Sequence, residues 1–312
     1  MSYQEIDFYN KTNLNSYNLN ESMRYQLNML DNLDVFTRKH SENVANLTCR
    51  ICEYLKLNKN FIVYCTMCAY LHDIGKQFIP STILQKPAKL TDKEYEVIKR
   101  HTTIGYDICI KDLNLRPFAN GPKYHHEALD GSGYPEGITK KDIPIEGQII
   151  RVADEYDAIV SKRQYKTHVG ISDTLKILVE NTKPYNHANA LNNLANNVKL
   201  GKDNPIIVKC LFKVVLDDID YEISCIMDYI DFLKEQIKRL DQIDKYYNKM
   251  INSKKEKEKN YYLEGIKILL TENETVENYK QILEEYKAAL IIRKNVIDNL
   301  FNEIKIIKKL MV

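Results

Sequence analysis

Residues 125–135 read HHEALDGSGYP, and the organisation of the whole chain follows from this stretch. His125, His126 and Glu127 directly precede a glycine-rich turn that ends at Pro135. Successive side chains of a helix point about 100° apart, so adjacent histidines can serve two different metal ions, or one ion and a neighbouring partner. Taken alone, the stretch also fits a polar helix end that runs into an ordinary turn. The histidines elsewhere in the chain weaken that second interpretation.

Composition excludes several classes of protein. The net charge of +2 over 312 residues does not suggest a surface for a nucleic-acid polymer. The N-terminus carries early acidic residues and lacks the apolar run of a secretory signal. No stretch approaches the roughly 20 apolar residues that a membrane span needs. Seven cysteines are an odd number, which favours reduced thiols. These features predict a cytoplasmic protein without a membrane span.

The hydrophobic pattern predicts an all-α fold in three parts. Residues 1–20 form a polar arm, and residues 21–222 form a helical domain in which apolar residues recur at three- and four-residue spacings. From Ile223 a 3-4 alternation typical of a coiled-coil seam begins, pauses at a charged stretch and resumes to the C-terminus. We therefore expect residues 223–312 to form a long helical hairpin or a coiled coil. The sequence leaves open whether these helices pair within one chain or make a homodimer.

Expected helices of the domain carry the candidate metal ligands. We place helices at 37–57, 61–75, 92–111 and 145–160, the third opened by a capping box of Thr91 and Glu94. The candidate ligands are imidazoles and carboxylates from these segments and from the opening stretch: His40, His72, Asp73, His101, His125, His126 and Asp154. They include five of the seven histidines, which is hard to explain by isolated structural roles.

This donor set indicates a chemistry. Imidazole and carboxylate ligands without an obligatory thiolate suit iron or manganese, and zinc less selectively. A carboxylate such as Asp73 can bridge two ions, and two ions about 3.5–4 Å apart can hold a hydroxide that attacks a phosphodiester. Lys76, four residues after His72, could neutralise charge on the phosphate. Arg163 and Lys166 could grip phosphates, although by themselves they also fit a solvated basic run.

Four motifs together resemble one known family. Leu71-His72-Asp73-Ile74-Gly75-Lys76, His101-x-x-x-Gly105, HHEALDGSGYP and Val152-Ala153-Asp154-x-x-Asp157 are similar to the HD-GYP metal-dependent phosphohydrolases. The resemblance implies an HD-domain helical bundle and a cyclic di-GMP phosphodiesterase that forms linear pGpG and, on further cleavage, GMP. It assigns all seven candidate ligands to metal. It further implies that Asp73 and Lys76 are catalytic and that Lys76, Tyr134, Asp157, Arg163 and Lys166 bind substrate.

Departures from the family pattern shape the remaining expectations. Phe36 stands where three-metal members carry a glutamate, so we expect two divalent ions, iron or manganese. The alternatives are a nucleotide sensor or scaffold that signals to a protein partner through the C-terminal helices, or a hydrolase of another cyclic dinucleotide. The pairs Cys49-x-x-Cys52 and Cys65-x-x-Cys68 have zinc-site spacing, but they lie in apolar helical stretches and therefore favour core packing.

Overall fold

The computed structural model describes residues 33, 35–86, 88–161, 187–272 and 274–311. The polar arm at 1–20 and the predicted substrate residues Arg163 and Lys166 lie outside this part of the chain. The regular elements of the described residues are all helices, with only an isolated antiparallel bridge between Asp130 and Thr139. The all-α fold is therefore confirmed. None of the described helices is long and apolar enough to cross a membrane.

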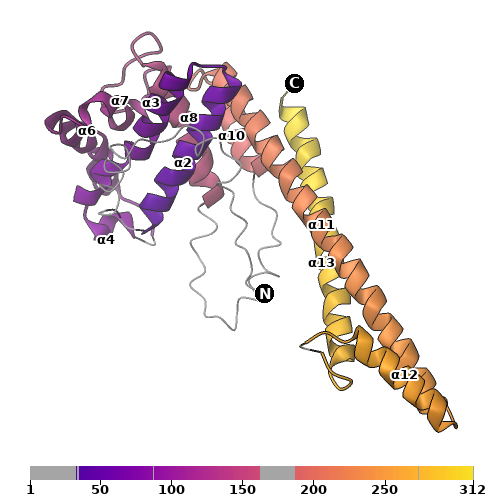
Figure 1. Ribbon diagram of the computed structural model, residues 1–312. Helices are drawn as coiled ribbons and strands as arrows, with labels where there is room; N and C mark the ends of the chain where they lie inside the picture. Colours follow the sequence, from indigo (N-terminus) through magenta and orange to yellow (C-terminus); the bar gives the residue numbers. More distant parts are fainter. Residues whose placement is uncertain (1–32, 34, 87, 162–186, 273, 312) are drawn as a thin grey trace. The chain divides into compact units, whose positions relative to one another are not determined.

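Internal contacts divide the chain into two units. The described residues up to 161, together with 187–216 and 306–311, form the first unit, and residues 217–305 belong to the second. The first unit is built around α2 (Val35–Tyr54), α3 (Lys59–Leu71) and α8 (Ile145–Ser161), which pack on one another (Figure 1). As expected, α3 is buried on most of its faces, and Asn58 caps its first turn by accepting a hydrogen bond from the Phe61 amide at 2.9 Å.

Shorter elements complete the first unit around these three helices. They are η4 (Ile74–Phe78), α4 (Ser81–Leu84), α5 (Asp92–Lys99), α6 (His101–Lys111), η5 (Arg116–Phe118), α7 (Asn120–Tyr124), α10 (His187–Lys199) and the first part of α11 (Pro205–Asn252). The helix α6 contacts η4 and α7, and α10 contacts α8. These contacts bring the ends of α3, α6 and α7 together beside α8.

Two of the differences between the predicted and observed helix boundaries affect the position of a site residue. The helix expected at 92–111 is two helices, because the Arg100 amide bonds to the carbonyl of Val97, three residues back, which tightens the turn before α6. The capping box of Thr91 and Glu94 is present. The helix expected at 61–75 ends at Leu71, so Lys76 lies in a 3₁₀ turn instead of one helical turn beyond His72.

The second unit contains an antiparallel helical hairpin that closes within the single chain. It comprises the later part of α11, α12 (Glu256–Leu269) and α13 (Tyr279–Leu310) as far as residue 305, with α13 beside α11 in Figure 1. The Tyr279 hydroxyl donates to Asp244 at 2.8 Å, and the Arg293 guanidinium lies 5.5 Å from the Tyr229 ring centroid. Residues early in α13 thus meet residues late in α11, which defines the antiparallel order. Arg293 interrupts the 3-4 alternation of apolar residues predicted for the C-terminal helices, and its guanidinium packs over the ring of Tyr229 instead.

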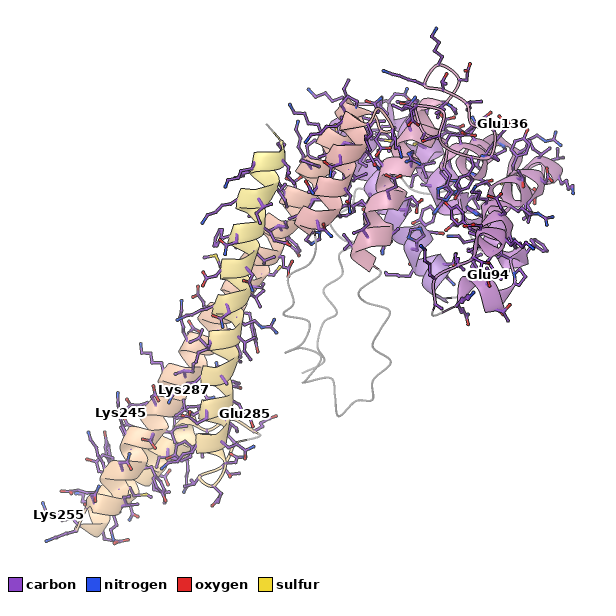
Figure 2. The ribbon with its side chains drawn as sticks, turned by 180° about the vertical axis from the view of Figure 1, so that it is seen from behind. Glu94, Glu136, Lys245, Lys255, Glu285 and Lys287 are labelled. Carbon is purple, nitrogen blue, oxygen red and sulfur yellow. The ribbon has the colours of Figure 1, made fainter. Side chains whose placement is uncertain are left out.

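A small apolar core and a charged exterior account for the stability of the hairpin. Leu240, Ile243, Ile266, Tyr279 and Leu283 are buried together. The charged stretch after α11 becomes the start of α12. Figure 2 shows the side chains of Lys245, Lys255 and Glu285 directed away from the helices, which fits the solvated face of such a structure.

Candidate metal centre

Separate elements of the first unit each contribute a ligand candidate. His40 comes from α2, His72 and Asp73 follow the end of α3, and His101 opens α6. His125 and His126 follow α7, while Asp154 lies on α8. The structure brings all seven predicted residues together, and their ligand atoms form three overlapping groups, each with its atoms within 4.8 Å of one another. The groups are His101, His125 and His126; His40, His72 and Asp73; and His72, His125 and Asp154.

Asp73 lies at the centre of the cluster, and its two carboxylate oxygens face different histidines. Its Oδ1 is 3.3 Å from His101 Nε2 and 4.0 Å from His125 Nε2. Its Oδ2 is 3.3 Å from His72 Nε2 and 3.7 Å from His40 Nε2. The carboxylate therefore separates the imidazoles into two sets, one on each oxygen.

The main chain orients three of the imidazoles. Nδ1 of His72 donates to the Ala69 carbonyl at 2.6 Å, and Nδ1 of His101 donates to the Ile98 carbonyl at 2.6 Å. Nδ1 of His125 donates to the carbonyl of Gly121 at 2.9 Å. Since Nδ1 carries the proton in each neutral ring, the Nε2 lone pair points into the cluster. Such a hydrogen bond on the outer nitrogen is typical of metal-binding histidines.

The inner atoms of the cluster lack partners that a cation would supply. His72 Nε2 and Asp73 Oδ1 are buried and accept no hydrogen bond from the described residues. His101 Nε2 and His125 Nε2 lie 3.2 Å apart, so two lone pairs face each other when both outer nitrogens are protonated. Buried polar groups without partners are costly, and divalent ions bound at the cluster would supply partners for these atoms. The donor set therefore fits a metal.

Burial and charge set the protonation states that such ligands need. Burial lowers the pKa of His126 to about 3, and it also lowers the pKa values of His101 and His125. These imidazoles are therefore neutral at physiological pH. Burial would raise the pKa of Asp73, but the nearby Lys76 ammonium and the histidines hold it well below its usual value. Asp73 therefore remains an anion that can hold cations.

His40 differs from the other histidines because carboxylates hold both of its nitrogens. Its Nε2 is 2.9 Å from Asp154 Oδ1, and its Nδ1 is 2.6 Å from Asp157 Oδ2. Burial alone would lower the pKa of His40, but these two hydrogen bonds raise it to about 10. The other Asp157 oxygen accepts from Asn43 Nδ2 at 3.1 Å. The sequence assigned Asp157 to substrate, whereas the structure gives both of its oxygens protein partners.

A buried glutamate holds the glycine-rich loop beside the cluster. Glu127 Oε1 accepts from the amides of Glu136 at 2.7 Å and Gly137 at 3.2 Å, and Oε2 accepts from the Ile138 amide at 3.2 Å. Gly133 packs so closely on the backbone of Glu127 that a Cβ there would overlap it. The loop is thereby tied to the histidine pair that precedes it.

Two further predicted substrate residues lie at the rim of the cluster. The Tyr134 ring stacks on the His126 ring with centroids 4.6 Å apart and an angle of 27°. The Lys76 ammonium donates to Asp73 Oδ2 and remains partly exposed. Both side chains are therefore next to the ligand candidates.

Sequence reasoning missed Arg151, which supports the cluster from behind. Its Nε donates to Asp203 at 2.8 Å, its guanidinium pairs with Glu155, and its Nη1 reaches the His126 carbonyl at 3.5 Å. The signal was its spacing: Arg151 lies three residues before Asp154 and so on the same side of α8. The four cysteines of the alternative zinc site are all buried and unpaired by disulfides. Burial raises the pKa of Cys49 to about 12, as expected of a core thiol.

Comparison with known proteins identifies the class that this helical cluster of histidines and aspartates defines. The HD domain family matches residues 24–188 of the 312-residue chain. The chain belongs to this family, in agreement with the resemblance to HD-GYP proteins seen in the motifs.

Curated relatives are named as cyclic dinucleotide phosphodiesterases. The chain is 46% identical over 143 residues to the "cyclic di-GMP phosphodiesterase" of Thermotoga maritima, covering 45% of this chain and 39% of that protein. It is 41% identical over 127 residues to the "cyclic di-GMP phosphodiesterase response regulator RpfG" of Xanthomonas campestris, covering 40% and 34%. It is 34% identical over 153 residues to the "3'3'-cGAMP-specific phosphodiesterase 3" of Vibrio cholerae, covering 49% and 33%. The chain thus spans less than half of the length of each relative.

Proposed function

We propose that this protein is a metal-dependent phosphodiesterase that opens cyclic di-GMP to linear pGpG, which a second cleavage converts to GMP. The names of the relatives in Thermotoga and Xanthomonas support this substrate, and the motifs support the reaction class. The name of the Vibrio relative makes 3'3'-cGAMP the second candidate substrate.

The position of the Asp73 carboxylate among the histidines is the main observation in support of the proposal. Its two oxygens face two sets of imidazoles, which supports two divalent ions bridged by this carboxylate, iron or manganese by ligand type. His101, His125 and His126 would hold one ion, and His72, Asp154 and a deprotonated His40 the other. When bound, such a pair supplies Lewis-acid charge to a phosphoryl group and lowers the pKa of water.

The surrounding residues have roles that follow from their positions. Lys76 would donate from its ammonium to a phosphate oxygen, for which its partial exposure leaves room. Tyr134 would line the substrate pocket beside His126. Asp157 would act as a positioning residue, because its hydrogen bond fixes the ring of His40. Arg163 and Lys166 remain predictions.

The domain organisation predicted from the sequence completes the proposal. Residues 21–222 would form the catalytic domain, and the C-terminal hairpin would carry a regulatory input or a contact with a signalling partner. The homodimer and the cytoplasmic location likewise remain predictions.

A product assay tests the proposal. Purified protein with Mn(II), or with Fe(II) under anaerobic conditions, is given cyclic di-GMP, and the nucleotides are resolved by chromatography. We expect pGpG or GMP from the wild type, and neither product nor bound metal in Asp73→Ala. Asp142→Asn, which changes an exposed aspartate of the same domain, is the matched control. Tight nucleotide binding without turnover, in metal-replete protein, would contradict the proposal and favour the sensor.

A further inference from the structure

Two tyrosine rings and a lysine ammonium lie together beside the candidate metal centre. We call Tyr95 and Lys99 of α5, together with Tyr134 of the glycine-rich loop, the aromatic wall. Tyr95 and Lys99 lie one helical turn apart, and Tyr95 is 46% exposed. The Lys99 ammonium lies 5.0 Å from the Tyr95 ring centroid and 5.5 Å from the Tyr134 ring centroid. The two tyrosine rings are 6.5 Å apart at 78°. In Figure 2 the labelled Glu94 marks this helix.

The wall is continuous with the metal centre. Tyr134 packs edge-on against Tyr95 on one side and stacks on His126 on the other. The His126 side chain is 22% exposed, so it is at once a ligand candidate and accessible from solvent. A substrate whose phosphate lies at the metal centre would therefore extend over Tyr134 toward Tyr95 and Lys99.

The chemistry of the wall matches a purine base. Exposed aromatic faces stack on nucleobases, and stacking does not depend on which base is present. An ammonium adds selectivity, because guanine presents two acceptors, N7 and O6, where adenine presents N7 and an amino donor. The Lys99 ammonium has three N–H groups, and Glu96 accepts one of them at 2.7 Å. The structure shows no other hydrogen bond from this ammonium to the described residues, so two of its N–H groups are available to a base.

We propose that Tyr95, Lys99 and Tyr134 form a guanine-binding subsite, in which Tyr95 stacks on the base and Lys99 donates to its N7 and O6 atoms. The assignment rests on the proposed function for the position of the phosphate. It makes Tyr95 and Lys99 specificity residues on an element outside the motifs that define the metal centre. The competing explanation is that the three side chains only pack α5 against the loop.

Mononucleotide binding separates these explanations without requiring turnover. GMP and AMP are titrated into full-length, Mn(II)-loaded protein by calorimetry. We expect Tyr95→Ala to weaken both nucleotides about tenfold and Tyr95→Phe, which keeps the ring, to retain binding. Lys99→Met should weaken the binding of GMP about tenfold with little change in the binding of AMP. Lys99→Arg, which keeps the positive charge, should retain the preference for GMP. Lys280→Met is the matched control, since that lysine also lies over two tyrosine rings, in the second unit.

The outcomes are distinct. A wild type that binds GMP no better than AMP overturns the subsite, as does Lys99→Met with an unchanged ratio of the two dissociation constants. Weaker binding together with lost metal would indicate packing alone and would also overturn it. The predicted binding pattern in a protein that does not hydrolyse cyclic di-GMP would preserve the subsite and contradict the proposed function. If Tyr95→Ala and Lys99→Met hydrolyse cyclic di-GMP as well as the wild type, the result would support the proposed function and contradict the guanine subsite.

Discussion

Glu127→Gln is the substitution that most directly tests how the glycine-rich loop is held. The buried carboxylate accepts three backbone amides, two at Oε1 and one at Oε2. Glutamine has nearly the same shape, but it replaces one oxygen by an NH₂ group and removes the negative charge. In its less costly orientation, the amide nitrogen takes the place of Oε2 and faces the Ile138 amide, donor against donor.

The expected cost follows from these three bonds. A hydrogen bond to a charged group contributes about 1.5–3 kcal/mol and a neutral one about 0.5–1.5 kcal/mol, so the two bonds that remain each lose about 1 kcal/mol. The unpaired Ile138 amide adds about 1 kcal/mol or more. The sum is about 3 kcal/mol of local stability, which corresponds to roughly a 100-fold rise in the population of the open loop.

Hydrogen exchange measures this quantity directly. The amides of Glu136, Gly137 and Ile138 should exchange roughly 100-fold faster in Glu127→Gln, while those of α6 and α8 keep their rates. Asp130→Asn is the control, because this exposed side chain accepts hydrogen bonds from Ser132 of the same loop and holds none of the amides at 136–138. Unchanged exchange at 136–138 would show that another contact holds the loop. An equal rise throughout the first unit would show global destabilisation instead.

Three further substitutions probe packing and charge. Gly75→Ala should prevent folding or metal binding, because its Cβ would overlap the His101 carbonyl; soluble, metal-loaded protein would refute this. Arg239→Lys should lower the free energy of unfolding of the hairpin, measured by urea titration, by about 1–3 kcal/mol, since lysine cannot reproduce the bidentate contact with Glu274; an unchanged urea midpoint would contradict it. Burial raises the pKa of Glu303 to about 7, above its value in the unfolded chain, so ionisation destabilises the fold as pH rises through 7. Glu303→Gln should therefore raise the melting temperature at pH 9 but not at pH 5, and equal shifts at both would exclude this cause.

The candidate ligand cluster could be predicted because its signal is local. His72-Asp73 and the pair before the glycine-rich turn are recognisable by residue type and spacing, and each pair directly follows a helix of the structure. The hairpin seam was visible for the same reason, since Ile226, Ile230 and Leu233 alternate regularly and are buried.

What could not be predicted depends on contacts between distant segments. The family resemblance assigned Asp157 to substrate, and the sequence does not show that its carboxylate also meets His40, 117 positions away. Lys76 was placed one turn beyond His72 because nothing local reveals that α3 ends at Leu71. Tyr95 carries no local signal in the sequence, since only the folded loop brings Tyr134 to it.

The histidine rings of the cluster are oriented by different kinds of group, so the cluster should tolerate mutation better around some rings than around others. His72, His101 and His125 are each directed by a carbonyl of their own segment, a group that no amino-acid replacement can delete. The ring of His40 instead depends on the side chain of Asp157, so a single codon change can release it. Evolutionary drift and deliberate redesign should therefore change the orientation of the His40 ring first. The other three rings should keep their orientation through extensive sequence change.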